Sequence, residues 1–503
     1  MTAPTDAHLL HDLLDRAAAR WPDAVAVTDD LGAVTFGELR RRSLRLAGWL
    51  HGRGVRRGDR VLVAMPADTL LPAVLYAVSR VGAVFAVVRT PAPDVALIHL
   101  LDDAEPVLVL TDDPDAGRLA AQRRVDHHGR TDLLAVLTAT DPPEGTGTAP
   151  LTVDPVCLIY TSGSTGMPKA VVSTHAQVVY AATAIQGQLG YRPDDVVYTA
   201  LPMSFDYGLY QLFLGALAGA RVHLPSPDSA GRRLLACLRD SGATILPAVP
   251  SLAVNLVRLL RRPGAVAPPV RLLTNTGAAM APEILAALRQ RIPGLRVQLM
   301  FGLTECKRAT IMPPDEDLHR PGACGLALPG TEIFAADDTG RRLPADTVGE
   351  LVVRGPHVMA GYWRRPELTA QRFRRRDGLF PQLHTGDYGR IDADGYLHFE
   401  GRRDDLYKER GIRVSATEVE AASHRVPGVE AAGVLPPTDG HGGATLVVVG
   451  PLAPAEVLTG LRAQLEESKL PTRCLVVPSL PLNGNGKVDR RRLARLVAGE
   501  DHG

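Results

Sequence analysis

The chain has 503 residues, which is more than one compact core accommodates, and this length predicts at least two domains. Hydrophobic residues make up 45% and charged residues 22%, a composition typical of soluble globular proteins and not of disordered chains. The net charge of +1 supports neither a nucleic-acid partner nor an anionic membrane surface, so neither is expected.

Alternating helix and strand patterns cover the first third of the chain. A helix is predicted over 35–50, because Thr35 and Glu38 supply a start signal and Gly52 and Gly54 supply a stop. This alternation predicts an α/β fold in which helices cover the faces of parallel sheets. Apolar runs predict buried strands at 60–65, 82–88 and 107–110.

The remaining segments suggest where the domains divide. Residues 113–154 are rich in Asp, Thr, Pro and Gly and predict surface loops that lead to a strand at 156–160. Helices and strands continue to about residue 400, where a charged link at 401–405 precedes a small α/β unit. Within that unit, Ser415 and Glu418 predict a capped helix start. We therefore expect a large domain at 1–402 and a small one at 403–503.

The N-terminus and the cysteines indicate the compartment. Residues 1–21 contain acidic side chains and no long apolar run, so they predict neither a signal peptide nor a membrane span. The cysteines are scattered and odd in number, which argues against a disulfide framework or a zinc site and fits a reducing cytoplasm. They are Cys157, Cys237, Cys306, Cys324 and Cys474.

A glycine-rich loop gives the strongest local signal for function. It follows a predicted strand and reads Tyr160-Thr161-Ser162-Gly163-Ser164-Thr165-Gly166-Met167-Pro168-Lys169. Its backbone N–H groups, hydroxyls and ammonium group suit the phosphates of a nucleotide better than they suit a plain flexible loop. It is not a Walker A loop, because Lys169 is followed by Ala170 and the two glycines are three residues apart.

Further motifs follow this loop in a fixed order. They are Asn275-Thr276-Gly277-Ala278-Ala279, Met300-Phe301-Gly302-Leu303-Thr304-Glu305, His384-Thr385-Gly386-Asp387, Gly401-Arg402-Arg403-Asp404, the run from Lys408 to Arg413, and Asn483-Gly484-Asn485-Gly486-Lys487. In kind and order they resemble the adenylate-forming superfamily of acyl-CoA ligases, luciferases and nonribosomal peptide synthetase adenylation domains. The chain is most similar to the stand-alone adenylation enzymes that load amino acids onto carrier proteins. The resemblance implies a large domain of packed sheets and helices with a small mobile C-terminal domain.

The resemblance also implies roles for the reacting groups, with ATP and Mg²⁺ as cofactors. Lys487 corresponds to the lysine that bridges the substrate carboxylate and the α-phosphate, and the chain has only four other lysines. Thr304 is expected to donate to the α-phosphate and Glu305 to bind Mg²⁺, which prefers carboxylate oxygen. The phosphate loop residues expected to bind ATP are Thr161, Ser162, Gly163, Ser164, Thr165, Gly166 and Lys169.

The same resemblance assigns the nucleoside and the moving parts. Phe301 is expected to stack on adenine beside Gly277 and Ala278, although a core aromatic is the alternative. Asp387 is expected to accept hydrogen bonds from the ribose hydroxyls, and Arg402 to reach ribose or phosphate oxygens. The small domain is expected to rotate at a hinge and to open a channel for the thiol arm. The hinge and channel residues are Asp404, Gly411 and Arg413.

Substrate choice rests on a second group of residues. Asp206 matches the position where amino-acid-activating members hold the α-ammonium, and a helix N-terminal acid is the alternative. Lys307 and Arg308 could bind a second substrate carboxylate or carbonyl. Alternatively, and by our preference, they pair with Asp206 or with Asp315, Glu316 and Asp317 and only shape the wall. The other residues expected at the acid are Tyr207 and Tyr210, which narrow the pocket, together with Thr276 and Met300.

The thiol acceptor is expected to be supplied in trans, since no carrier domain with its attachment serine follows the ligase motifs. We therefore expect an amino acid:carrier-protein ligase of natural-product biosynthesis, acting on a small amino acid and an acyl or peptidyl carrier protein. An acyl-CoA ligase for a small carboxylic acid is the alternative. A non-catalytic nucleotide-binding relative is disfavoured, because it would not need to keep every catalytic group.

Overall fold

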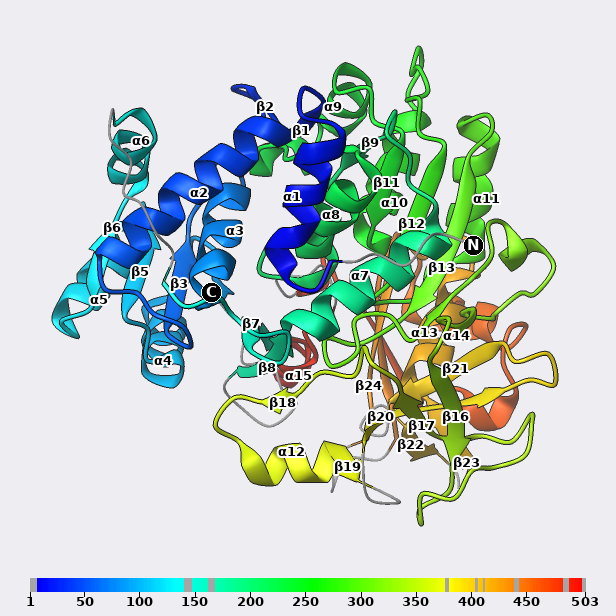
Figure 1. The fold of residues 1–503 in the computed structure, drawn as a ribbon. Helices are drawn as coiled ribbons and strands as arrows, with labels where there is room; N and C mark the ends of the chain where they lie inside the picture. The colour runs from blue at the N-terminus through cyan, green and yellow to red at the C-terminus, as the bar shows by residue number, and fades with distance from the viewer. Residues whose placement is uncertain are drawn as a thin grey trace.

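The computed structural model describes residues 7–139, 147–161, 168–375, 380–402, 406–409, 412–437, 443–482 and 488–499. Within them, two mainly parallel sheets frame the N-terminal three quarters of the chain (Figure 1). The first has the order β15-β14-β13-β12-β11-β9-β10-β1-β2, and the second the order β18-β8-β7-β4-β3-β5-β6. We call them the β12 sheet and the β7 sheet. The α/β class expected from the sequence is confirmed.

The strands of these sheets are short and rich in apolar residues, as expected for strands buried on both faces. The β12 sheet contains β1 (Val25–Thr28), β2 (Ala33–Thr35), β9 (Val196–Tyr198), β10 (Arg221–His223), β11 (Ile245–Ala248), β12 (Leu272–Asn275), β13 (Arg296–Phe301), β14 (Thr310–Ile311) and β15 (Leu326–Ala327). The β7 sheet contains β3 (Arg60–Ala64), β4 (Val84–Val87), β5 (Leu108–Thr111), β6 (Asp126–His128), β7 (Pro155–Thr161), β8 (Lys169–Thr174) and β18 (Gly361–Tyr362). The strands expected at 60–65, 82–88, 107–110 and 156–160 are therefore present.

A layer of helices fills the space between the two sheets. One hydrophobic core joins these helices to strands of both sheets, and every residue of α3 is buried. A helix that is apolar on all sides is stable only when it is enclosed in this way. The layer contains α1 (Leu10–Arg20), α2 (Phe36–Gly52), α3 (Leu71–Val81), α7 (His175–Leu189) and α8 (Asp206–Ala218).

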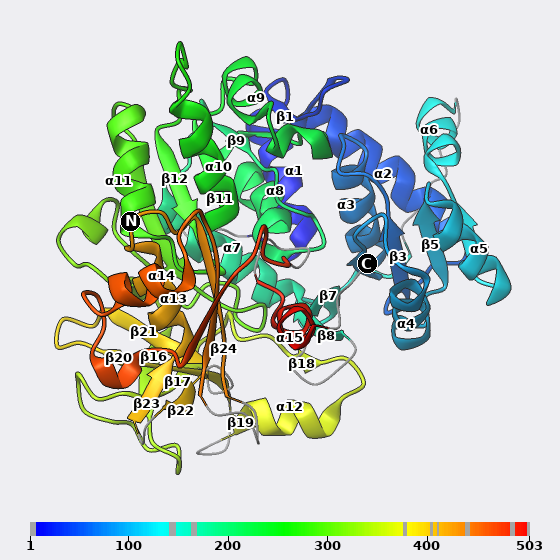
Figure 2. The same cartoon turned by 180° about the vertical axis from the view of Figure 1, so that it is seen from behind.

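Other helices cover the outer faces. Figure 2 shows α10 and α11 on the side of the β12 sheet away from this layer. Their apolar residues pack onto the strands, as the inward stripe of an amphipathic helix does. The outer helices of this part are α4 (Asp94–Ala104), α5 (Pro114–Gln122), α9 (Leu234–Asp240), α10 (Pro250–Leu260) and α11 (Pro282–Arg291). Helix α6 (Arg130–Thr138) packs against α2 and joins the core between the sheets.

Two predictions about local structure have different outcomes. The expected helix at 35–50 is confirmed as α2, and the Thr35 hydroxyl caps it by accepting the Glu38 N–H. The prediction of surface loops over 113–154 is wrong, because α5, β6 and α6 lie there. Asp113 caps α5 through the N–H groups of Asp115 and Ala116, so a residue read as a loop former begins a helix instead.

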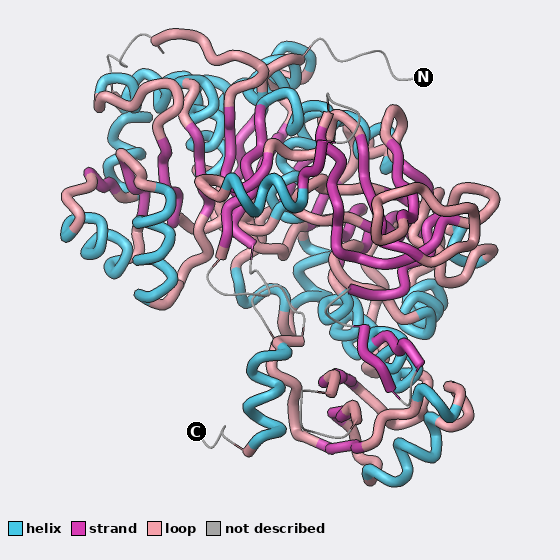
Figure 3. Tube along the Cα trace, turned by 90° about the horizontal axis from the view of Figure 1, so that it is seen from below, coloured by secondary structure: helices cyan, strands magenta, loops and turns pink. Residues whose placement is uncertain are grey.

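The rest of the chain forms smaller sheets. An antiparallel sheet of β16, β17, β19, β20 and β21 follows the β12 sheet, and the C-terminal residues build a separate core around β24 and β25. Figure 3 shows this C-terminal part below the larger body. These strands are β16 (Glu332–Ala336), β17 (Gly349–Arg354), β19 (Phe373–Arg375), β20 (Pro381–Ile391), β21 (Leu397–Arg402), β22 (Leu406–Glu409), β23 (Ile412–Ser415), β24 (Ala431–Leu435), β25 (Thr445–Val449) and β26 (Arg473–Val476).

The last helices are α12 (Pro366–Arg372), α13 (Ala416–His424), α14 (Pro454–Leu461) and α15 (Arg490–Ala498). As expected, Ser415 caps α13 by accepting the Glu418 N–H. The division into domains at residue 402 stays a prediction. In the part of the chain that the structure describes, no helix combines the length and the apolar character that crossing a membrane requires.

Candidate active site

The motif residues gather at one edge of the β12 sheet. Strands β9, β11, β12 and β13 run parallel, so their carboxyl ends point to the same edge. The motif at 275–279 begins at the end of β12, the motif at 300–305 begins at the end of β13, and α8 starts shortly after β9. Open α/β sheets bind their ligands at this edge.

The loop after β13 turns back on itself within a few residues. The Ala309 N–H donates to the Phe301 carbonyl at 2.9 Å, and Lys307 adopts a left-handed backbone with φ of 61°. A Cβ atom on Gly302 would lie 2.0 Å from the Lys307 carbonyl oxygen, so only glycine allows this return. The loop thereby directs Thr304, Glu305, Lys307 and Arg308 into the interior.

Asp206 lies at the centre of a buried charge cluster. Arg308 Nη1 donates to Asp206 Oδ2 at 3.2 Å and to the Lys307 carbonyl at 2.8 Å. The Lys307 ammonium donates to the Thr304 carbonyl at 2.9 Å, and the Thr304 hydroxyl lies 3.5 Å from Asp206 Oδ1. Lys307, Asp206 and Arg308 are 0%, 3% and 4% exposed. We call these three residues the Asp206 cluster; it contains two cations and one carboxylate, and the carboxylate pairs with Arg308.

The cluster is buried, and one of its polar atoms, like two buried hydroxyls outside it, has no partner among the described residues. Burial lowers the pKa of Lys307, while the Asp206 carboxylate opposes that shift. Arg308 Nε and the hydroxyls of Tyr210 and Thr276 make no hydrogen bond to any described residue. Buried polar groups usually have partners, so the region around Asp206 suits a polar ligand.

Lys307 and Arg308 were expected either to bind the substrate or to pair with acidic side chains, and the contacts test the expected pairings. The pairing of Arg308 with Asp206 is present. The pairing with the acids at 315–317 is wrong: Asp315 and Asp317 accept from Arg289, and Glu316 pairs with Arg320. The sequence did not indicate that Arg289 pairs with these aspartates, because Arg289 lies on α11, more than twenty residues earlier in the chain.

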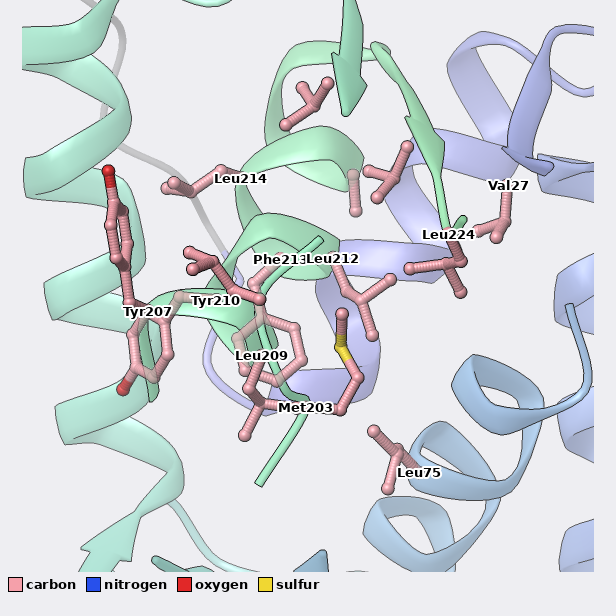
Figure 4. Close-up of a cluster of buried hydrophobic side chains, with 14 of the residues drawn as sticks. Val27, Leu75, Met203, Tyr207, Leu209, Tyr210, Leu212, Phe213, Leu214 and Leu224 are labelled. Carbon is pink, nitrogen blue, oxygen red and sulfur yellow. The ribbon is translucent and has the colours of Figure 1, made fainter. Parts of the chain in front are cut away.

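The residues expected to narrow the pocket are buried beside the cations. The Tyr207 ring lies 4.7 Å from the Arg308 guanidinium, and its hydroxyl lies 2.7 Å from Thr274 Oγ1. The Tyr210 ring lies 5.6 Å from the Lys307 ammonium. Figure 4 shows both rings on the side of α8 away from Leu224. Thr276 and Met300, which were expected at the acid, are also buried here, at the ends of β12 and β13.

A second group surrounds Glu305, which is 7% exposed. The Tyr362 hydroxyl donates to Glu305 Oε1 at 2.6 Å, and the Lys169 ammonium lies 4.0 Å from the same oxygen. Burial raises the pKa of Tyr362 and Glu305 raises it further, so its hydroxyl remains a donor. Burial lowers the pKa of Lys169, while Glu305 opposes that change.

The Glu305 carboxylate is suited to bind a magnesium ion that also contacts the phosphates of a nucleotide. Among the described residues, no group of three His, Cys, Asp or Glu side chains could hold a metal on its own. Mg²⁺ is usually bound through one or two carboxylates together with substrate phosphates and water. Glu305 would supply that carboxylate next to Lys169, the last residue of the expected phosphate loop.

The residues expected at adenosine lie along neighbouring edges. Phe301 ends β13 with its ring 5.6 Å from that of Phe399. Gly277 has φ of 87° just after β12, and Ala278 beside it is exposed. Asp387 on β20 is buried and accepts from Arg402 Nε at 3.1 Å, since β20 and β21 pair at these residues. Arg402 therefore reaches the carboxylate expected to bind ribose.

Other expected residues lie outside the described part of the chain or at its borders. Thr161, at the end of β7, is half-buried. Arg413 lies in β23, which is described for its backbone. Leu482 and Val488 form a bridge, so the two ends of the segment that contains Lys487 lie together. Outside the described residues lie Ser162, Gly163, Ser164, Thr165, Gly166, Asp404, Gly411 and Lys487.

Tyr362 was missed by reasoning from the sequence. It belongs to Gly361-Tyr362-Trp363-Arg364-Arg365, and none of the motifs used for the assignment covers this run. The available signal was a glycine before an aromatic pair, which marks a close approach of the backbone. The partner Glu305 lies 57 residues earlier, so the contact itself could not be predicted.

Comparison with known proteins places the chain among enzymes. The profile of the family described as "AMP-binding enzyme" matches residues 14–363. The probable non-canonical nonribosomal peptide synthetase CymA of Salinispora arenicola is 34% identical over 96% of this chain, which spans 6% of CymA. Feruloyl-CoA synthase of an Amycolatopsis species is 31% identical over 95% of this chain and 97% of that enzyme.

Solved structures extend the comparison. The crystal structure of VinN is 41% identical with a TM-score of 0.72, covering 78% of this chain and 98% of that one. VinN in complex with L-aspartate is 40% identical with a TM-score of 0.71 and has the same coverage. ATP-bound MatB from Rhodopseudomonas palustris is 28% identical with a TM-score of 0.85, covering 98% of this chain and 99% of that one.

The substitution Asp206→Asn tests whether the buried carboxylate stabilises the two cations. Removing one charge from a buried pair leaves its partner uncompensated, so we expect the free energy of unfolding to fall by about 3–5 kcal/mol. The measurement is urea denaturation at neutral pH. The matched control is Glu283→Gln, which removes an exposed acid from the first turn of α11.

A helix N-terminal acid contributes only about 0.3–1 kcal/mol, so the control should show a loss within that range. Equal losses in the two variants would mean that Asp206 is a helix-end acid and not a counter-ion. The double variant Asp206→Asn with Arg308→Met should lose less than the sum of the two single variants.

Proposed function

Because the chain belongs to the AMP-binding enzyme family, we propose that it activates an amino acid with a second carboxylate and transfers it to a carrier protein. The chain is an adenylate-forming enzyme that uses ATP and Mg²⁺. The amino acid, its second carboxylate and the carrier protein are the parts that we propose. The observation that carries the substrate proposal is the Asp206 cluster, in which two buried cations accompany one buried anion and only Arg308 pairs with it.

The chemistry explains why the site is rich in cations. The reaction joins a carboxylate to the α-phosphate of ATP, and these two groups repel each other. Fixed positive charge that offsets this repulsion stabilises the transition state. We assign that role to Lys487, with the Thr304 hydroxyl donating to the α-phosphate. Mg²⁺, when bound through Glu305, neutralises phosphate charge.

The nucleotide is held by groups on the β7 sheet, the β12 sheet and the antiparallel sheet that contains β20 and β21. The loop from Thr161 to Lys169 leaves the end of β7 and binds the phosphates. Phe301, with Gly277 and Ala278, lies at the carboxyl edge of the β12 sheet and receives adenine. Asp387 accepts from the ribose hydroxyls, and Arg402 keeps that carboxylate oriented through the 3.1 Å bond.

The charges of the Asp206 cluster match an acidic amino acid. Asp206 takes the substrate ammonium, and Lys307 and Arg308 take the carboxylate that does not react. One anion against two cations leaves the empty site with an excess positive charge, which an acidic amino acid offsets. VinN has been solved in complex with L-aspartate and with 3-methylaspartate, and both ligands carry one ammonium and two carboxylates.

A long aliphatic acid fits this region badly. It would bring no second charge to offset the cations and would surround them with hydrocarbon, at a cost of several kcal/mol. The rings of Tyr207 and Tyr210 lie beside the cations, and Thr276 and Met300 are buried at the ends of β12 and β13. The site therefore favours a small, polar substrate.

Transfer to the thiol follows in a second arrangement of the C-terminal part. We propose that this part rotates at Asp404, so that Lys487 leaves the site and the segment with Gly411 and Arg413 enters it. One hinge then serves two reactions at one nucleotide site. CymA, a nonribosomal peptide synthetase by name, supports a carrier protein as the acceptor.

A CoA ligase is the second candidate function. Feruloyl-CoA synthase, whose length the chain almost fully covers, favours it. The two functions share the first reaction and differ in the acceptor of the second. Thioester formation with CoA and with a phosphopantetheinylated carrier protein, measured on the same enzyme, distinguishes them, and transfer to CoA alone would exclude the carrier protein.

Substrate preference is tested by ATP–pyrophosphate exchange with L-aspartate, L-asparagine, L-alanine, succinate and octanoate. L-Aspartate should give the highest kcat/KM, because only it supplies an ammonium and a second carboxylate. Arg308→Met should lower kcat/KM for L-aspartate about 100-fold, since a buried charge pair contributes about 2–3 kcal/mol.

Arg296→Met is the matched control for Arg308, because Arg296 lies on β13 with an exposed side chain. It should exchange at the wild-type rate. A best response to octanoate, or an Arg308 variant as active as this control, would remove the acidic amino acid from the proposal and leave the ligase activity intact.

The role of Lys487 is tested by separating the two half-reactions. Lys487→Ala should lower adenylate formation at least about 100-fold, because fixed positive charge at the reacting phosphate is lost. Transfer from a supplied aminoacyl adenylate to holo-carrier protein should stay within a few-fold of wild type. The control is Lys469→Ala, which removes a lysine paired with Glu418. Equal loss of both half-reactions in Lys487→Ala would refute the assignment.

A further inference from the structure

The carboxylate of Glu305 is held by a tyrosine from a distant short strand. The Tyr362 hydroxyl donates to Glu305 Oε1 at 2.6 Å, and both side chains are buried. The other oxygen, Oε2, makes no hydrogen bond to any residue that the structure describes. One oxygen is thus fixed by the protein, and the second remains available.

Strand β18 places Tyr362 with little freedom. It pairs antiparallel with β8, where Tyr362 lies opposite Val171. The Tyr362 N–H donates to Thr369 Oγ1 at 2.9 Å, and its ring meets Phe373 edge-on at 5.4 Å. A side chain held by a sheet, a helix and an aromatic contact has one orientation available, so its hydroxyl is preorganised.

The backbone beside Tyr362 is shaped for this approach. Gly361 has φ of 129°, and a Cβ atom there would lie 2.5 Å from Thr369 Cγ2. The Met359 N–H also donates to the Glu305 carbonyl at 2.8 Å. The segment 359–362 therefore holds Glu305 at its main chain and at its carboxylate.

Lys169 connects this contact to the phosphate loop. It begins β8, and its ammonium lies 4.0 Å from Glu305 Oε1 and 4.0 Å from the centre of the Tyr362 ring. A cation over an aromatic face is attracted to the ring. Tyr362 thus contacts the proposed metal ligand through its hydroxyl and a proposed phosphate ligand through its ring.

We propose that Tyr362 is a positioning residue for the metal: its hydroxyl fixes Glu305 Oε1 and leaves Oε2 to bind the Mg²⁺ of the nucleotide. The inference rests on the metal role that the proposed function gives to Glu305. Groups that orient a metal ligand typically change metal affinity 10- to 100-fold when they are removed.

Tyr362→Phe is the test, because it removes the hydroxyl and keeps the ring beside Lys169 and Phe373. With a non-hydrolysable ATP analogue bound, the affinity for Mn²⁺, measured by electron paramagnetic resonance, should fall about tenfold. Affinity for the analogue without metal, measured by calorimetry in EDTA, should change less than twofold. Pyrophosphate exchange should return to the wild-type rate at high Mg²⁺.

Tyr180→Phe is the matched control. It removes a tyrosine hydroxyl that donates to the Pro329 carbonyl at the same distance of 2.6 Å. Its Mn²⁺ affinity should equal that of the wild type. Thermal unfolding of both variants shows whether either loses the fold.

Glu305→Gln distinguishes the positioning role of Tyr362 from the metal-binding role proposed for Glu305. If Glu305→Gln weakens Mn²⁺ binding and Tyr362→Phe does not, the inference is overturned and the metal role of Glu305 stands. If Glu305→Gln keeps wild-type Mn²⁺ affinity, the proposed metal role also fails. A Tyr362→Phe variant that loses metal-free nucleotide affinity as much as Mn²⁺ affinity would show a structural role and overturn the inference.

Discussion

The buried contact between Asp206 and Arg308 is the interaction on which the rest of the site depends. Three charged side chains lie almost without exposure where β13 meets α8, and Asp206 is the anion among them. Removing such charges from water is costly unless each finds a partner. The charges of this cluster do not balance: its single carboxylate pairs with Arg308, and the Lys307 ammonium donates to the Thr304 carbonyl instead. A protein keeps such an imbalance at little benefit to stability, so we attribute it to recognition of an anionic ligand.

The fold supplies this cluster through one sharp return of the chain. The carboxyl ends of the parallel strands β9, β12 and β13 lie at a common edge. Because Gly302 has no Cβ, the Lys307 carbonyl can lie against its backbone, and this lets the loop after β13 turn back. The same turn brings the Glu305 carboxylate to Lys169 and Tyr362. Acid recognition and nucleotide binding therefore share one loop, with Thr304 between them. A change in the loop should affect both reactants together, as expected for a site that must bring two anions into contact.

Sequence reasoning found the elements that local patterns determine. The α/β class, the helix after Thr35 and the strand before the phosphate loop all agree with the structure. Sequence reasoning failed where the structure depends on packing between segments that are distant in the chain. The segment 113–154 reads as loops because Asp and Pro also begin helices, and here Asp113 caps α5. The contact from Tyr362 to Glu305 depends on the pairing of β18 with β8, which neither segment encodes alone.

The central claim is that an acidic amino acid binds in the Asp206 cluster and offsets its excess positive charge. The most direct measurement is calorimetric affinity for L-aspartate and for L-asparagine, with a non-hydrolysable ATP analogue present. These ligands have nearly the same shape and differ by one charge. L-Aspartate should bind at least about tenfold more tightly, because a desolvated charge pair contributes at least about 1.4 kcal/mol more than a neutral contact. Equal affinities, or tighter binding of L-asparagine, would contradict the account.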